Sequence, residues 1–184
     1  MEPDESLRGQ LLIASPALLD PNFARSVVLV VEHNDEGAMG IVLNRPSTAA
    51  VAEAVAPLED LVAGDEPVFV GGPVEPAAVV VLAEFDDTDA AAALVFGDLG
   101  FLRADADASV LESAARRFRV FAGYSGWGAG QLEAELEEPS WIVASPELED
   151  VFNEEPDGLW GSVLRRKGGH FALIATMPPD PSLN

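Results

Sequence analysis

The chain has 184 residues, 48% of them hydrophobic, and carries a formal net charge of −22. This length is enough to bury a sizeable core in one domain, and the absence of cysteine excludes disulfides and thiolate metal sites. The negative charge repels nucleic acid and anionic membranes at long range. We expect one domain over residues 1–184, with loose tails at 1–8 and 178–184.

The first apolar runs of the chain predict short buried strands. Residues 10–14 form an apolar run that a Ser-Pro pair closes, which is typical of a buried strand. Residues 26–33 and 38–44 are apolar segments on either side of an Asn-Asp-Glu-Gly turn signal. They predict a β-hairpin with a four-residue loop.

A helix is expected after this hairpin. Ser47 or Thr48 would cap it, and apolar residues recur at spacings of three and four from Val51 to Val62. Pro57 lies inside this pattern, so it should kink or split the helix.

The remaining segments predict more strands than helices. Residues 90–96 fit a helix or a strand equally well. The other expected strands are 67–70, 77–84, 101–102, 118–124, 141–144 and 171–176, and the other expected helices are 109–117, 129–138, 145–152 and 158–167. Because the helices are interspersed irregularly among the strands, the pattern indicates an α+β fold.

The segment 121–133 is the most constrained part of the chain, because four glycines fall within residues 123–130. Ser125 lies in a near match to the hydrolase motif G-x-S-x-G, but Trp127 replaces the last glycine, and only His33 or His170 could serve as the base. Neither G-x-G-x-x-G nor a P-loop is present. We interpret the segment as a structural turn, with an anion site at the following helix N-terminus as the alternative.

Polar residues at strand ends have a structural and a functional interpretation. Asn44 and Arg45 could tie two loops together or contact a ligand. Tyr124 and Trp127 could plug the core or line a pocket. The basic clusters 116–119 and 165–167 are interpreted as local neutralisers of the acidic surface.

Several segments in fixed order resemble one family of small bacterial proteins, the YqgE/AlgH family. They are residues 10–16 with Phe23, 26–46, 71–74 and 123–133. The resemblance runs from about Gln10 to Lys167, and the alanine-rich, lysine-poor composition resembles actinobacterial members. It implies an α+β fold in which a mixed or antiparallel sheet curls into a pseudo-barrel with surrounding helices. It implies no established enzymatic activity, and one label attached to the family is transcriptional regulator.

We therefore predict a non-enzymatic protein that binds a protein or small-molecule partner in a regulatory role. The candidate binding residues are Asn44, Arg45, Gly71, Gly72, Tyr124, Trp127 and Gln131. No cofactor, metal or membrane contact is expected, and the sequence leaves the oligomeric state open. Cytoplasmic localisation is expected, because the sequence starts without a signal-peptide pattern and its apolar runs are shorter than the roughly 20 residues that cross a bilayer. The alternatives are a regulator acting on DNA, which the net charge disfavours, and a hydrolase using Ser125.

Overall fold

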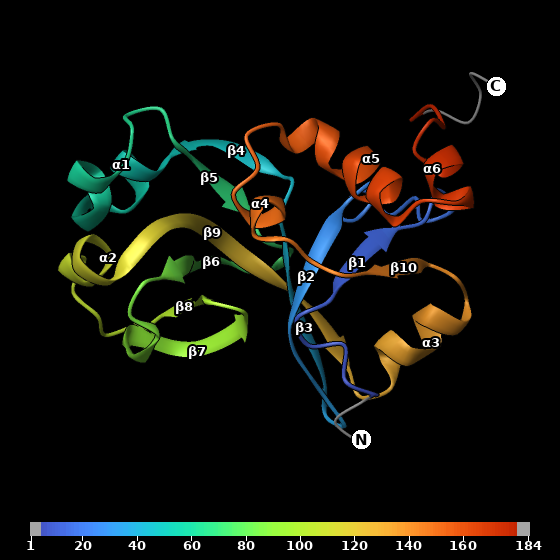
Figure 1. The fold of residues 1–184 in the computed structure, drawn as a ribbon, viewed down its shortest axis with the longest axis horizontal. Coiled ribbons are helices and arrows are strands. Elements are labelled where there is room, and N and C mark those ends of the chain that lie inside the picture. Colours follow the sequence, from blue (N-terminus) through green and yellow to red (C-terminus); the bar gives the residue numbers. More distant parts are fainter. Residues whose placement is uncertain (1–4, 180–184) are drawn as a thin grey trace.

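The computed structural model describes residues 5–179 and consists of a curled sheet with helices around it (Figure 1). The strands are β1 (Leu11–Ala14), β2 (Val27–Asn34), β3 (Gly37–Val42), β4 (Pro46–Ala50), β5 (Pro67–Val70), β6 (Val74–Phe85), β7 (Ala91–Phe96), β8 (Leu99–Leu102), β9 (Ala115–Gly128) and β10 (Trp141–Ala144). The helices are α1 (Val51–Ala54), α2 (Ser109–Ala114), α3 (Gln131–Glu137), α4 (Leu148–Val151), α5 (Pro156–Lys167) and α6 (His170–Ile174), with 3-10 helices η2 (Ala56–Leu61) and η3 (Thr88–Ala90).

The sheet is organised around the long strand β9. Its main path runs β10-β1-β2-β3-β9-β6-β8-β7, and β5 pairs with both β4 and β9. The β5–β9 pair is parallel and the other pairs are antiparallel. In Figure 1, α5 and α6 lie over the β1–β2 side, whereas α1 and α2 lie at the opposite end of the molecule. The predicted α+β class with a curled sheet is confirmed.

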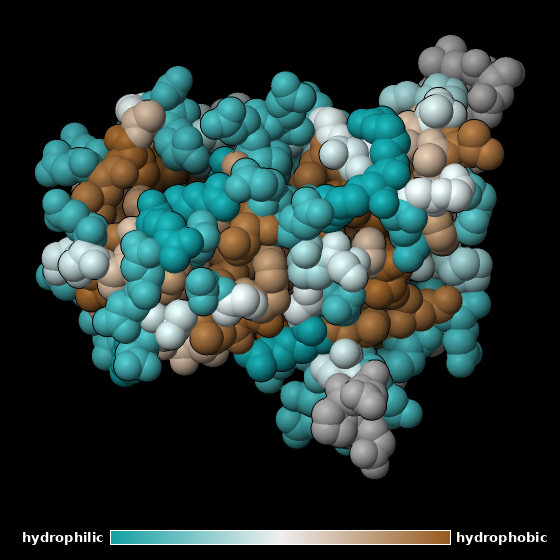
Figure 2. Space-filling model, viewed as in Figure 1, coloured by the Kyte–Doolittle hydropathy of each residue, from teal (hydrophilic) through white to brown (hydrophobic). Residues whose placement is uncertain are grey.

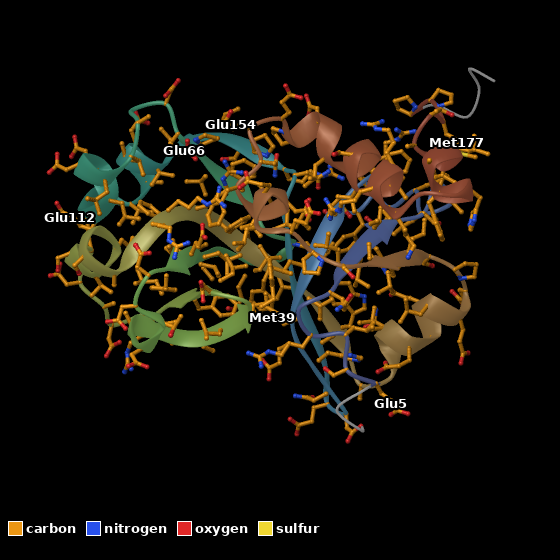
Figure 3. The ribbon with its side chains drawn as sticks, viewed as in Figure 1. Glu5, Met39, Glu66, Glu112, Glu154 and Met177 are labelled. Carbon is orange, nitrogen blue, oxygen red and sulfur yellow. The ribbon has the colours of Figure 1, made fainter. Side chains whose placement is uncertain are left out.

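Three clusters of buried side chains fill this architecture. The central cluster joins β1, β2 and β9 to α5 and α4. A second cluster packs α3 against β1, β2 and two tryptophans, and a third lies between β6, β9, α1 and α2. The surface over them is largely hydrophilic, with hydrophobic residues showing between the polar ones (Figure 2), and side chains fill the space between the layers (Figure 3). No helix in the described residues has the length and hydropathy to span a membrane.

The glycine-rich segment is a strand and not a turn. β9 continues through it to Gly128, because β3 pairs with its C-terminal part. Gly123 has a φ of 71° within the strand, and Gly130, with a φ of 74°, makes the left-handed step that starts α3. The helix expected over 109–117 ends at Ala114 for a related reason, since Ala115 already pairs with β6.

The helix expected from Ser47 begins later and is shorter. Residues 46–50 form β4, because they pair with β5 rather than continuing as a helix. The following helix is split between α1 and η2, with Pro57 near the start of η2, as predicted. Residues 91–96, which fitted either structure, form strand β7.

The expectation for the C-terminal segment 171–176 is wrong, because His170–Ile174 is helix α6. Gly168 and Gly169 have φ values of 80° and 58°, and they redirect the chain so that α6 packs beside α5.

The expectation of a loose tail over 1–8 is wrong for residues 6–8. Ser6 and Arg8 donate hydrogen bonds to the carbonyls of His33 and Val31, and the Leu7 backbone N–H donates to the His33 ring. Of the tail expected at 178–184, residues 178 and 179 line a pocket beside Arg25. Residues 1–4 and 180–184 of the two expected tails lie outside the described part of the chain.

Candidate functional site

Asn44 and Arg45 tie the end of β3 to the loop before β2. The Asn44 side chain accepts a hydrogen bond from the Val27 N–H at 3.0 Å and donates one to the Arg25 carbonyl at 2.9 Å. The Arg45 guanidinium donates to the Ala24 carbonyl at 2.6 Å. Both side chains therefore act as the polar tie that was one of the two interpretations from the sequence.

Gly71 and Gly72 allow the chain to pass very close to β9. A Cβ added to Gly71 would lie 2.3 Å from the Gly123 carbonyl oxygen, and one added to Gly72 would lie 2.2 Å from the backbone of Tyr124. The Gly71 N–H also donates to the Ala122 carbonyl. Close packing of two backbones explains why these positions are glycine.

Trp127 and Gln131 meet at one carboxylate, Glu135. The indole N–H of Trp127 donates to Glu135 at 2.9 Å, and that of Trp141 donates to the same oxygen at 2.8 Å. The Gln131 amide donates to the other oxygen at 3.1 Å and accepts from the Gly128 N–H at 3.0 Å. This network fixes α3 against the end of β9.

The seven candidate residues do not form one cleft. Arg45 and Gly72 line a hollow of about 250 Å³, whereas Trp127 lines a separate hollow of about 210 Å³ beside the β2–β3 hairpin. Tyr124 packs against the central cluster. A ligand-binding role for these residues remains a prediction.

Ser125 is placed for packing. Its side chain is completely buried, and its hydroxyl donates to the Gly71 carbonyl at 3.2 Å. In the described residues, no group of three His, Asp or Glu side chains is arranged to hold a metal ion.

His33 links the N-terminal segment to α3. Its Nδ1 accepts from the Leu7 N–H at 2.9 Å, so its Nε2 carries the proton that is shared with Glu133 at 2.7 Å. The pKa of Glu133 lies below its usual value, because the carboxylate accepts hydrogen bonds from its own backbone N–H and from His33; Asp35 nearby opposes the shift.

We expect the His33–Glu133 pair to stabilise the fold near neutral pH and to lose this effect in acid. A carboxylate whose pKa is depressed by folding stabilises the fold above its unfolded pKa of about 4.3, and this contribution is lost as the pH falls through the lower folded pKa. The difference in unfolding free energy between wild type and Glu133→Gln should therefore shrink as the pH falls from about 6 to about 3. Denaturant titrations at each pH measure it.

The matched control is Glu137→Gln, an exposed carboxylate on the same helix. Its difference from wild type should change less over the same pH range. A Glu133→Gln difference that stays constant from neutral to acid pH would contradict the assignment.

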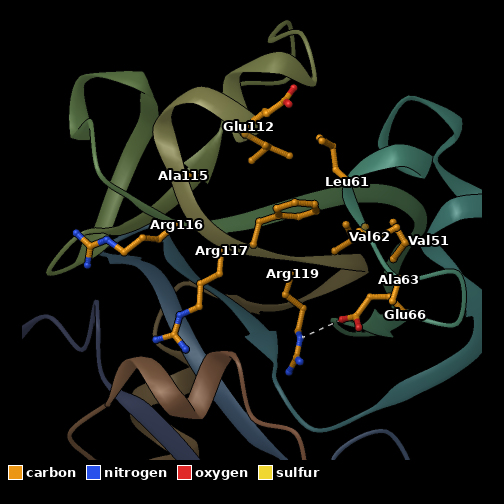
Figure 4. Close-up of a pocket in the computed structure, with 13 residues that line it drawn as sticks. Val51, Leu61, Val62, Ala63, Glu66, Glu112, Ala115, Arg116, Arg117 and Arg119 are labelled. Atoms are coloured by element: carbon orange, nitrogen blue, oxygen red, sulfur yellow. Dashed lines mark ion pairs between the residues drawn. The ribbon is translucent and has the colours of Figure 1, made fainter.

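A cleft of about 430 Å³, which the sequence did not single out, lies between η2 and α2. Its floor is the first half of β9, residues 115–120. One wall carries Val51, Leu61 and Val62, and Leu111 and Glu112 close the other side. In Figure 4, the arginines of β9 extend away from the apolar wall, so one cleft offers both an apolar side and cations.

Two of the three arginines along the cleft are held in short ion pairs, whereas the third, Arg119, has a long one, with its Nε 3.9 Å from Glu66 (Figure 4). Arg116 contacts Glu84 and Asp86 at 2.9 and 2.6 Å, and Arg117 contacts Glu84 and Glu149 at 2.7 and 2.8 Å. These pairs agree with the interpretation of the cluster as a local neutraliser. Among these three arginines, only Arg119 lacks a short ion pair.

Arg119 is a buried cation, and one of its N–H groups has no hydrogen-bond acceptor. Its side chain is 11% exposed, and its Nη1 donates to the carbonyls of Val151 and Asn153. Its Nε is buried and has no hydrogen-bond acceptor, because the carboxylate of Glu66 lies 3.9 Å away. Burial lowers the pKa of Arg119, although Glu66 and Glu154, which lie along the same side of the molecule in Figure 3, oppose the shift.

Nearly all the other bases of the chain are also engaged within the fold. Each base except Arg165 donates to a backbone carbonyl or an acidic side chain in the described residues. These bases are Arg8, Arg25, Arg45, Arg103, Arg116, Arg117, Arg119, Arg166 and Lys167. A pairing of this kind is not visible in the sequence, but the alternation Arg117-Phe118-Arg119-Val120 on one strand is a signal that charged side chains lie above a buried layer.

Comparisons with known proteins give one consistent result. Residues 11–172 match the family model described as AlgH-like, DUF179. A UPF0301 protein of Thermobifida fusca is 45% identical over 97% of this chain and 96% of its own length. A UPF0301 protein of Mycobacterium tuberculosis is 44% identical over 96% of this chain and 90% of its own length.

Two solved structures show the same arrangement. A crystal structure of a protein from Corynebacterium diphtheriae has a TM-score of 0.86 at 29% identity and covers 96% of this chain and 95% of that one. The solution structure of the AlgH protein from Pseudomonas aeruginosa has a TM-score of 0.71 at 30% identity and covers 97% of each chain.

Proposed function

This chain belongs to the AlgH-like family, as its sequence resemblance predicts, and we propose that it is a cytoplasmic, non-enzymatic protein that acts in regulation by binding a protein or small-molecule partner. We place the binding site in the cleft between η2 and α2. The observation that carries this proposal is Arg119, which lines that cleft and whose buried Nε has no hydrogen-bond acceptor.

The chemistry of the cleft favours a ligand with an apolar body and one anionic group. A buried charge without full pairing is costly, and a carboxylate that enters the site would relieve this cost. Leu61, Val62 and Leu111 offer apolar contact to the rest of the ligand. Glu66 and Glu112 also line the cleft and would repel a ligand with several negative charges.

The two alternatives have less support. A regulator acting directly on DNA needs free cations, whereas nine of the ten bases donate to partners within the fold. A hydrolase would need an accessible nucleophile, whereas Ser125 is completely buried and donates to a backbone carbonyl.

The proposal is tested with hexanoate, which carries one carboxylate on a short apolar chain. Titration of isotopically labelled protein should shift the amide NMR signals of residues 61–63 and 115–120. Arg119→Gln should weaken binding by about tenfold or more, because a hydrogen bond to a charged group contributes roughly 1.5–3 kcal/mol. The matched control Arg103→Gln removes an exposed arginine outside the cleft and should leave binding unchanged.

Arg119 also donates to two backbone carbonyls, and Arg119→Gln removes these hydrogen bonds. A second variant that keeps them is therefore needed. Ala63→Trp serves this purpose, because Ala63 is exposed and lines the cleft that the indole would fill. Both variants should bind hexanoate about tenfold or more weakly than wild type. The proposal is wrong if the wild-type signals do not move, or if either folded variant binds as tightly as wild type.

A further inference from the structure

The two edges of β9 are used very differently. One edge pairs with β6 along almost its whole length, from Ala115 to Tyr124. The other edge pairs with β3 over residues 125–128 and with β5 at residues 121 and 122. Among the described residues, no strand pairs with residues 115–119 on this second edge.

The backbone of Phe118 faces this open edge. The Gly71 N–H donates to the Ala122 carbonyl, so the backbone polar groups of Ala122 point toward β5. Backbone groups alternate between the two edges of a strand, and the β6–β9 register is regular from Val79 to Glu84, so Phe118 points the same way. In the described part of the chain, no turn or loop donates to or accepts from these groups of Phe118.

The open edge faces the cleft and not open solvent. The cleft of about 430 Å³ has residues 115–120 as its floor, and η2 and α2 flank it. Exposed strand edges are sites where an extended chain can add as a further strand.

The two faces of β9 differ in chemistry at this edge. Phe118 lies in the apolar cluster that includes Leu111, Leu61 and Val62. The guanidinium groups of Arg117 and Arg119 lie over the rings of Phe152 and Phe69 in the opposite layer. Successive side chains of an added strand would therefore meet apolar residues and arginine alternately.

We propose that the cleft binds an extended peptide segment of a partner protein, which adds as a strand to the open edge of β9. The inference rests on the function proposed above and names its ligand. The segment alternates small apolar residues, which pack toward Leu61 and Val62, with polar residues, one of which is an acid that pairs with Arg119. A single acid is specified because the chain carries a charge of −22 and the cleft already contains Glu66 and Glu112.

The test uses a capped hexapeptide, Val-Ser-Val-Glu-Val-Ser, and a same-composition control, Val-Val-Val-Ser-Glu-Ser. Binding is followed by calorimetry and by the NMR signals of residues 115–120. The alternating peptide should bind about tenfold or more tightly than the control, because only it presents one face to each layer. Ala63→Trp should abolish binding, and Ala92→Trp, at an exposed alanine on β7, should not affect it.

Backbone methylation gives the sharper readout. Only alternate N–H groups of an added strand face β9, so N-methylation of one alternate set of residues should abolish binding. N-methylation of the other set should leave binding within about twofold. If the peptide bound through its side chains alone, the two N-methylated peptides would not differ in this way.

The outcomes separate the two proposals. If hexanoate binds at Arg119 but both methylated peptides bind like the parent peptide, or the control peptide binds equally well, strand addition is wrong and the proposed binding cleft stands. If neither hexanoate nor either peptide shifts the signals of residues 115–120, both proposals are wrong.

Discussion

Gly72→Ala should destabilise the protein by about 3–5 kcal/mol, because it combines strain with overlap. Gly72 has a φ of 154°, which side chains rarely adopt, and its new Cβ would lie 2.2 Å from the carbonyl carbon and oxygen of Tyr124. These are backbone atoms in the middle of β9, which β6 holds at Tyr124. Relief of the overlap would therefore require separation of β9 from the segment that follows β5.

The matched control is Gly64→Ala, where a Cβ would meet nothing within 4 Å. This variant should be neutral or stabilised by up to about 1 kcal/mol, because alanine restricts the unfolded chain. Denaturant unfolding of both variants measures the contrast. Equal stabilities for the two variants would show that the close approach of Gly72 to β9 is not a feature of the folded protein.

This close approach also explains why the glycine-rich segment was interpreted wrongly as a turn. Local glycine density indicates unusual backbone geometry, but it does not distinguish a turn from close contact between two strands. The partner segment, Gly71 and Gly72, lies about fifty positions earlier in the chain, and a Cβ at Gly71 would meet Gly123. Strands 67–70 and 141–144 were predicted with the correct bounds, because each is a short apolar run with clear breaks at its ends.

Pairing between strands far apart in the sequence also explains the other differences between the predicted elements and the structure. Ser47 and Thr48 are good capping residues, but β5 provides a strand partner for residues 46–50. Ala115 extends a helical pattern locally, but it pairs with Phe85 of β6. Tertiary context of this kind overrides local propensity.

The candidate site was partly predictable. Trp127 and Gln131 are close in sequence, and the structure joins them through Glu135, a residue that the sequence did not single out. The cleft beside Arg119 was not predicted, because its walls come from residues near 61, 111 and 118. The Nε of Arg119 has no hydrogen-bond acceptor, and the same guanidinium donates to the carbonyls of Val151 and Asn153, which no local pattern contains.

Trp127→Ala should destabilise the protein by about 3–5 kcal/mol, the usual range for truncation of a buried aromatic. The indole is 6% exposed, and its ring centroid lies 6.3 Å from Phe23 and 6.0 Å from Trp141. Its removal would leave a cavity between β3, β9 and α3. It would also remove one of the two indole N–H groups that share an oxygen of Glu135.

Trp127→Phe separates these two contributions. It keeps an aromatic ring in the cluster but loses the hydrogen bond to Glu135, so it should cost about 1–3 kcal/mol, less than the alanine variant. Leu19→Ala is the matched truncation of an exposed side chain, at 67% exposure, and should change stability by less than about 0.5 kcal/mol. Denaturant unfolding of the three variants measures the order. If Trp127→Ala left the free energy of unfolding nearly unchanged, the indole would not support the core. That result would favour a role for Trp127 as an exposed binding residue.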